Sequence, residues 1–300
     1  MPSYATHHIF AATVQRVTGD SVARIAAAYP AGYRWGAQGP EPLCLYHAPF
    51  PSQMRRLAQR MRTEPPAPLF EALCEAAVRE HNTAALAYVF GFCTNYALDR
   101  VTHAFIGAQA DRLALYVPGY SAEARRKLAE SDIDGIMIAG FIAAEPAKFE
   151  AYRLLDPNAA ECTVLSRVVS SAAKSVYGMR VPPAAVYHSL HDMRRILHLT
   201  HSGSHARGRL QWVERLFGKA GQASSLIRPA EPLAADCANE EHRPWLSDGV
   251  ERTDSFCDLF DAAVPLAVSL QRAVLDRYYQ QKPLDPRFFP TDFTGTVAKS

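Results

Sequence analysis

The stretch from Leu86 to Phe105 constrains the fold of this chain more than any other. It is apolar on nearly every side of a helix, except for a stripe formed by Asn95, Asp99 and His103. Residues four apart share a helical face, so these three lie within about 80° of one another. A helix that is apolar all round is usually buried, and a buried carboxylate or imidazole must be paired, hydrogen-bonded or bound to a metal. The stripe is therefore either a satisfied polar seam between helices or a functional site.

Helical spacing of apolar residues covers most of the remaining chain. It occurs in residues 1–30, 53–62, 69–81, 83–106, 121–141, 161–177, 182–201, 211–217 and 255–281. Residues 31–52 hold three Gly and four Pro, which predicts a loop. No useful length of strand alternation and no internal repeat occurs. We therefore predict a single all-α domain over residues 1–300, with a loosely attached tail from about 283 to 300.

Charge and cysteine usage narrow the class of protein. The chain has 32 basic and 30 acidic residues, which gives no electrostatic footprint for nucleic acid. The first residues lack the pattern of a signal peptide, and no apolar run is long enough to span a membrane. Six scattered cysteines without a CxxC motif predict free, mostly buried thiols in a reducing compartment, and hence a cytoplasmic location.

A second polar stripe follows in the segment RKLAESDID. Arg126, Glu130 and Asp134 again stand at four-residue steps, so they share one helical face that could lie against the first stripe. The simpler interpretation of Arg126 and Glu130 is a solvent-facing ion pair. Similarly, His7 is either a site residue or an ordinary residue at a helix start, with His8 as its exposed neighbour.

Several motifs resemble, in order, the zinc-dependent phospholipase C family, an all-α fold shared with a group of secreted nucleases. They are MPSYATH, GAQGPE, RLAQRMRTEPPAPLFEAL, AYVFGFCTNYALDRVTHAFI, RKLAESDID and DCANEEHRPW. The resemblance covers most of the chain. It implies a cluster of up to three zinc ions among the helices, which activate water and hold the phosphate of a phosphodiester.

The resemblance also assigns eight ligand positions. Four are retained, namely His7, Asp99, His103 and Glu130. Four are changed: Glu41 stands in place of an aspartate, and Arg62, Asn95 and Arg126 stand in place of histidines. Zinc takes Cys, His, Asp or Glu ligands, usually four, and a guanidinium cannot ligate because it has no acceptor. No implied zinc site keeps three good side-chain ligands.

These changes predict a salt-bridged centre without a cofactor, in which Arg62 and Arg126 supply the positive charge that metal supplies in the family. If any cofactor is present, it is zinc. The preferred function is a non-catalytic binding or regulatory module for a phosphorylated or phospholipid-like ligand. The first alternative is an active phosphodiester hydrolase with one or two weakly held zinc ions, in which Asp99 and His103 are catalytic. The second is a structural or interaction protein with a salt-bridged cleft. The placement of the two guanidiniums distinguishes the three.

A separate histidine group needs its own interpretation. Its members are His188, His191, His198, His201 and His205. His191 and His198 share a helical face and could form an independent metal site. However, Gly203 is expected to end the helix, and Asp192 is the only carboxylate in the stripe. A basic, partly exposed face is therefore the favoured interpretation.

Overall fold

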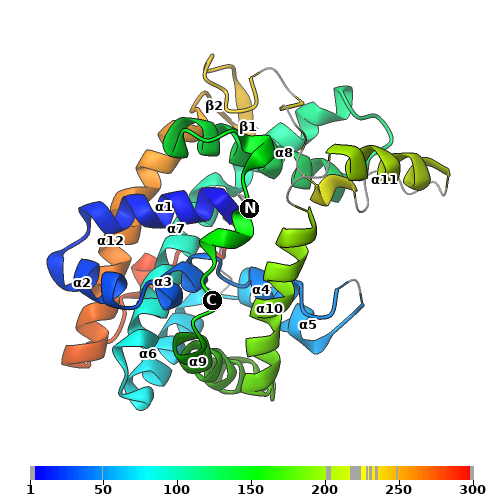
Figure 1. Ribbon diagram of the computed structural model, residues 1–300. Coiled ribbons are helices and arrows are strands. Elements are labelled where there is room, and N and C mark those ends of the chain that lie inside the picture. The colour runs from blue at the N-terminus through cyan, green and yellow to red at the C-terminus, as the bar shows by residue number, and fades with distance from the viewer. Residues whose placement is uncertain are drawn as a thin grey trace.

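The computed structural model describes residues 4–48, 50–200, 204–216, 224–227, 229, 232–233, 236–247 and 249–297 (Figure 1). Its α-helices are α1 (Tyr4–Val17), α2 (Asp20–Ala28), α3 (Pro30–Ala37), α4 (Glu41–Cys44), α5 (Gln53–Thr63), α6 (Pro66–Glu80), α7 (Thr83–Arg112), α8 (Ala122–Met137), α9 (Ala159–Tyr177), α10 (Pro183–Thr200), α11 (Ser204–Leu216) and α12 (Phe256–Gln280). The only strands in the described part form a short antiparallel hairpin, β1 (Trp245–Ser247) with β2 (Val250–Arg252). The predicted all-α class is confirmed for these residues.

Shorter helical turns connect these elements. The 3-10 turns are Leu113–Leu115, Pro146–Lys148, Ala151–Leu154, Ser224–Leu226 and Pro286–Phe288, and a π-helix, Ile138–Ile142, continues α8. Within the described ranges, no helix is long and apolar enough to cross a membrane. All six cysteines are free thiols, as predicted; four are buried, and Cys44 and Cys257 are partly buried.

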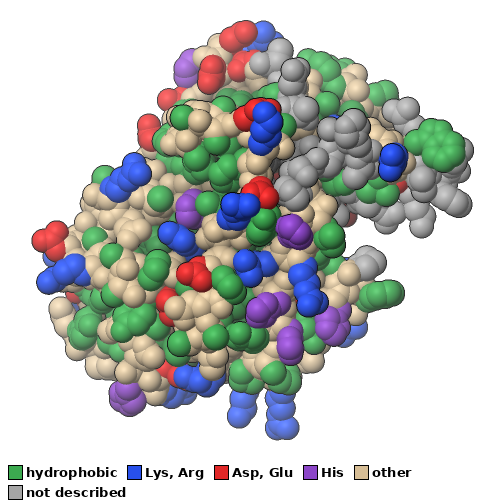
Figure 2. Space-filling view, in the orientation of Figure 1, with side chains coloured by type: hydrophobic (Ala, Val, Ile, Leu, Met, Phe, Trp, Pro, Cys, Tyr) green, Lys and Arg blue, Asp and Glu red, His purple; other side chains and the backbone are tan. Residues whose placement is uncertain are grey.

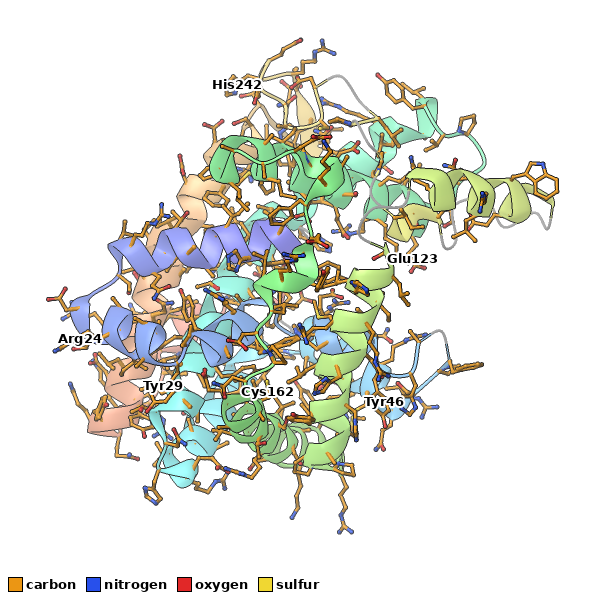
Figure 3. The ribbon with its side chains drawn as sticks, viewed as in Figure 1. Arg24, Tyr29, Tyr46, Glu123, Cys162 and His242 are labelled. Atoms are coloured by element: carbon orange, nitrogen blue, oxygen red, sulfur yellow. The ribbon has the colours of Figure 1, made fainter. Side chains whose placement is uncertain are left out.

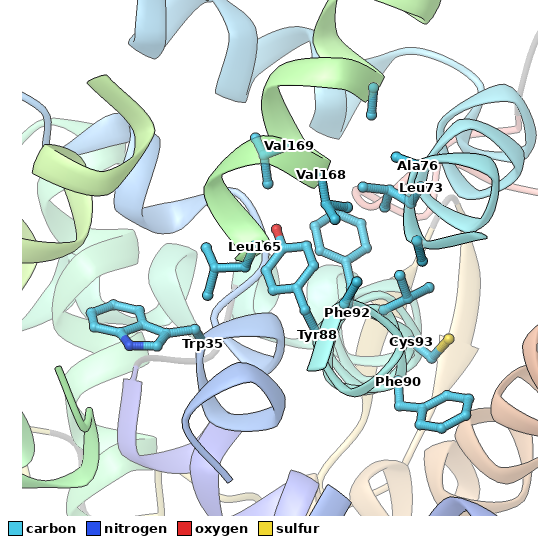
Figure 4. Close-up of a cluster of buried hydrophobic side chains, with 14 of the residues drawn as sticks. Trp35, Leu73, Ala76, Tyr88, Phe90, Phe92, Cys93, Leu165, Val168 and Val169 are labelled. Atoms are coloured by element: carbon cyan, nitrogen blue, oxygen red, sulfur yellow. The ribbon is translucent and has the colours of Figure 1, made fainter. Parts of the chain in front are cut away.

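Helix α7 is the central element (Figure 1). Every residue from Ala84 to Asp99 is buried, as the apolar pattern predicts. Its N-terminal half packs with α3, α6, α9 and α10 in one hydrophobic cluster, and its C-terminal half packs with α1, α8 and α12 in a second. Figure 4 shows the first cluster, in which Tyr88 and Phe92 of α7 lie near Val168 of α9. The two clusters divide between Tyr96 and Ala97, within the polar stripe.

The expectation of a loop over residues 31–52 is wrong, because α3 and α4 lie there. Helix α3 crosses α7 in very close contact through Gly36 and Gly91. A Cβ atom added to either glycine would overlap the backbone of the opposite helix. Glycine disfavours a helix in the sequence pattern, but the close packing of α3 on α7 requires glycine at these two positions. Only the tertiary contact reveals this, so composition gave the wrong prediction.

Two helices near the N-terminus are capped by carboxylates from distant helices. Asp134 of α8 accepts hydrogen bonds from the backbone N–H of Thr6 at 2.8 Å, from the Thr6 hydroxyl at 2.6 Å and from the Ala5 N–H at 3.2 Å. Glu161 of α9 accepts from the Gly32 N–H at 2.7 Å. The first N–H groups of a helix lack partners within it, and negative charge is favourable there. These contacts therefore fix α1 against α8 and α3 against α9.

The C-terminal segment is not loosely attached, in contrast to the prediction for residues 283–300. The Phe293 side chain is fully buried, and its ring centroid lies 5.0 Å from that of Tyr96. Tyr96 donates its hydroxyl to the Thr291 carbonyl at 2.7 Å, and the Phe293 N–H donates to the Arg62 carbonyl at 3.2 Å. The aromatic residues of the tail thus close the first hydrophobic cluster. Residues 298–300 lie outside the described part.

Candidate functional site: a buried charged cluster

The first polar stripe meets α1 in the core. The Nε2 atom of His7 lies 3.2 Å from Oδ1 of Asp99, and both side chains are almost completely buried. Asn95 lies beside them, with Nδ2 3.3 Å from Nδ1 of His7 and 3.1 Å from the Ala37 carbonyl, to which it donates. The chain turns at Gly39 with φ +55°, and a Cβ atom there would overlap the Asn95 amide. Asn95 thus links α7 to α1 and to the turn after α3.

Arg62 enters the same region from the last turn of α5 and forms an ion pair with Glu41 of α4. Burial lowers the pKa of the Arg62 guanidinium, although the carboxylates of Asp99 and Glu130 favour its charged form. A buried cation is retained when carboxylates surround it. Position 62, which the resemblance assigns to a histidine ligand, therefore carries a fixed positive charge near Asp99 and Glu130.

The second polar stripe packs against the first. Arg126 of α8 places Nε 3.4 Å from Oε1 of Glu130, and its Nη2 donates to the His103 carbonyl of α7 at 3.3 Å. The Arg126 side chain is 27% exposed and that of Glu130 is 20% exposed, so the pair is not the solvent-facing one of the simpler interpretation. Asp134, the third member, caps α1 as described above. The two stripes thus face each other.

The electrostatic setting keeps His103 neutral at ordinary pH. Burial, followed by the positive charge of Arg126, lowers the pKa of its imidazole to about 3. Burial and the negative charge of Glu130 raise the pKa of the Tyr4 hydroxyl. Tyr4 is thus a member of this cluster that sequence reasoning missed. The signal was its position three residues before His7, which places both on one face of α1.

The catalytic role predicted for Asp99 and His103 stays a prediction. The only ion-pair partner of Asp99 there is His7, and neither Asp99 oxygen accepts a hydrogen bond from the described residues. His103 has no side-chain hydrogen bond to Asp99. An imidazole with a pKa of about 3 is also a weak base at neutral pH, because a general base works best with a pKa near the operating pH.

Within the described residues, no three His, Cys, Asp or Glu side chains converge closely enough to hold a metal ion. A structural zinc site needs four such ligands, and a catalytic site needs three. Here the guanidiniums of Arg62 and Arg126 lie close to the carboxylates that would otherwise be available to bind a metal ion. In this cluster, positively charged arginines pair with negatively charged glutamates.

The remaining histidines lie elsewhere. His8 is half-buried and not exposed as expected; burial and the charge of Arg34 lower its pKa to about 4. On α10, His188 and His198 are exposed and His191 is partly buried, as expected for a basic, partly exposed face. Figure 2 shows several histidines on the face over α10. His201 and the side chain of His205 lie outside the described residues.

Asp192, the carboxylate within this histidine group, forms a hydrogen bond with the backbone of another segment. Asp192 accepts a hydrogen bond from the His47 backbone N–H at 3.0 Å. The preceding residue, Tyr46 (Figure 3), stacks its ring on that of His47. The contact joins α10 to the segment after α4. This supports a structural role for Asp192.

Comparisons of the chain with protein-family models, curated proteins and solved structures return no match. Membership of the zinc-dependent phospholipase C family therefore stays a prediction from the motifs. The site is defined by its own geometry, in which five helices bring their charged side chains to one place.

Proposed function

We propose that this protein is a non-catalytic, divergent relative of the zinc-dependent phospholipase C family, and that its charged centre holds the helices of a structural or interaction protein together. The observation that carries the proposal is the pairing of both arginines with acids of the cluster: Arg62 with Glu41, and Arg126 with Glu130. In this proposal the guanidiniums take the place of metal charge. Free thiols support a cytoplasmic location for this role.

The convergence of distant segments supports the family relationship. The resemblance assigns one cluster to residues on α1, α4, α5, α7 and α8, and spacing along the sequence does not require these helices to meet. His7 nevertheless lies against Asp99, and Arg62 lies close enough to Asp99 and Glu130 for their charges to affect its pKa. A divergent member that exchanged metal for arginine would retain this arrangement.

Two features favour the structural role over the other candidate functions. A binding module for a phosphorylated ligand in this centre needs a guanidinium free to face the ligand, whereas both arginines are already paired. A hydrolase needs an activated water, and His103 is too weak a base to provide one without a metal.

Zinc analysis tests the proposal. The purified protein, prepared without added zinc or chelator, should contain far less than one zinc per chain and should not hydrolyse bis(p-nitrophenyl) phosphate or phosphatidylcholine vesicles. The variant Arg62→His/Asn95→His/Arg126→His restores the histidines that the resemblance assigns, so it should gain tightly bound zinc. Two or more tightly bound zinc ions in the unaltered protein would overturn the proposal.

A matched control separates a restored site from added histidines in general. The variant Arg24→His/Arg56→His/Arg209→His places three histidines on exposed helical surfaces. It should bind no more zinc than the unaltered protein. Equal zinc uptake by the two variants, or none by either, would contradict the alignment of Arg62, Asn95 and Arg126 with metal ligands.

A further inference from the structure

A groove of about 450 Å³ lies where α9 turns into α10. It is lined by Arg167, Ser170, Ser171, Lys174, Arg180, Val181, Pro182 and Pro183. Arg167, Ser171 and Lys174 stand three or four residues apart and share one face of α9. Arg180 follows the turn at Gly178, whose φ of +64° ends the helix. None of these residues belongs to the charged cluster around Asp99.

The groove is strongly positive although the chain as a whole is nearly balanced. Three of its lining residues are cations and none is a carboxylate. A fourth cation, Arg79 of α6, donates from Nη2 to the Ser171 hydroxyl at 3.0 Å. Glu80 pairs with Arg167 at 2.6 Å and offsets one of these charges. Figure 2 shows Lys and Arg side chains projecting from the lower edge of the molecule, below α9 and α10.

Hydroxyl groups add hydrogen-bond donors to this charge. Ser170 donates to the Val181 carbonyl, which fixes the segment before α10 against α9. Ser171 accepts from Arg79, so its own hydroxyl proton is available to a ligand. The first turn of α10 borders the groove through Pro182 and Pro183, and the N-terminal end of a helix carries partial positive charge. Cations, a hydroxyl donor and a helix start together are suited to phosphate.

We propose that this groove binds a multiply charged phosphate-bearing group, with Lys174 and Arg180 as its principal contacts and with Arg167 and Ser171 in the same lining. Lys174 and Arg180 are exposed, and neither forms an ion pair in the described structure, so both cations are available. The group belongs to a soluble phosphate compound or to a phospholipid headgroup. This site is independent of the function proposed for the charged cluster.

Calorimetric titration with inorganic pyrophosphate tests the chemistry. The full chain should bind pyrophosphate at low ionic strength, and binding should weaken as salt is added. The variant Lys174→Glu/Arg180→Glu should bind about tenfold more weakly or worse, because each replacement turns an attraction into a repulsion. Both side chains are exposed, so the fold should be unaffected, which circular dichroism checks.

The matched control and a vesicle assay complete the test. Arg24→Glu/Arg209→Glu makes the same change in net charge on exposed surfaces of α2 and α11 and should bind like the unaltered protein. Pyrophosphate binding without sedimentation on vesicles of phosphatidylcholine with phosphatidic acid supports a soluble ligand. Sedimentation that depends on phosphatidic acid and on Lys174 and Arg180 supports a headgroup. No binding of either probe, or equal loss in both charge-reversal variants, overturns the proposal.

Discussion

Replacement of Arg62 by methionine tests the charged centre most directly. Methionine keeps much of the length and apolar volume of the arginine stem and removes only the guanidinium. Glu41 then loses its ion-pair partner, and the buried carboxylate of Asp99 loses a nearby cation. We expect the Arg62→Met protein to fold but to be clearly less stable than the unaltered chain.

The size of the effect follows from the burial of the pair. Breaking a fully buried ion pair by removing one partner costs about 3–5 kcal/mol. The Arg62 and Glu41 side chains remain 23% and 21% exposed, so water screens part of the uncompensated charge. We therefore expect a loss of about 2–4 kcal/mol in the free energy of unfolding. For a chain of this size the Tm should fall by about 3–6 °C.

Urea denaturation followed by circular dichroism measures this loss, and a double-mutant cycle assigns it. Glu41→Leu in the Arg62→Met background removes the unpaired carboxylate. The double variant should therefore lose less stability than the sum of the single variants, by about 1–3 kcal/mol. The surface variant Arg153→Met is the control. Its side chain is 69% exposed and pairs with Glu150, so the change should be within about 1 kcal/mol.

This prediction is contradicted if Arg62→Met is as stable as the unaltered protein while Arg153→Met behaves as expected. It also fails if the effects of Arg62→Met and Glu41→Leu are additive. Either result would mean that Arg62 does not compensate the acids of the centre.

Three further predictions concern other parts of the structure. Asp134→Asn should lower stability by about 1–3 kcal/mol and speed amide exchange at Thr6, because a charged acceptor of α1 is lost; unchanged exchange would contradict the cap. Gly91→Ala should destabilise by about 1–3 kcal/mol through overlap with α3, whereas Gly208→Ala, with open space around it, should be neutral or stabilising; thermal melts of both variants decide. Stability should fall as pH drops from 6.5 toward about 3, because the unfolded His103 imidazole binds a proton that the folded one cannot, with a slope of up to about 1.4 kcal/mol per pH unit. His103→Gln should flatten that slope in denaturation curves recorded across this range, and an unchanged slope would show that His103 is not responsible.

Local signals in the sequence were sufficient for most helices. Gly178 ends α9 with positive φ, and Ser121 caps α8 by accepting from the Ala124 N–H. Such signals act over a few residues, so they can be read without tertiary structure. Helix α3 was missed because its formation depends on a close approach to α7 at Gly91, about 55 positions further along the chain. The burial of the C-terminal tail depends likewise on distant aromatic partners.

The candidate site, too, was predictable from the sequence only in part. The i, i+4 spacing predicted the pairing of Arg126 with Glu130 and placed Asn95 and Asp99 on one face. Spacing could not show that Asp99 pairs with His7, or that Arg62 reaches Glu41, because these residues come from separate helices. The resemblance to a known family brought those segments together in the prediction. It could not reveal that Tyr4 shares the cluster or that Asp134 caps α1.

The caps that Asp134 and Glu161 provide also determine when α1 and α3 can be buried during synthesis of the chain. Asp134 and Glu161 satisfy backbone groups of α1 and α3 that precede them by 128 or 129 positions. A ribosome releases the N-terminal helices long before it has made either carboxylate. Until then those helix starts must remain in water or be held by a chaperone, because a buried N–H without an acceptor is costly. The starts of α1 and α3 can therefore be buried only after the middle of the chain has been made, and a nascent protein stalled before residue 134 would leave both starts uncapped.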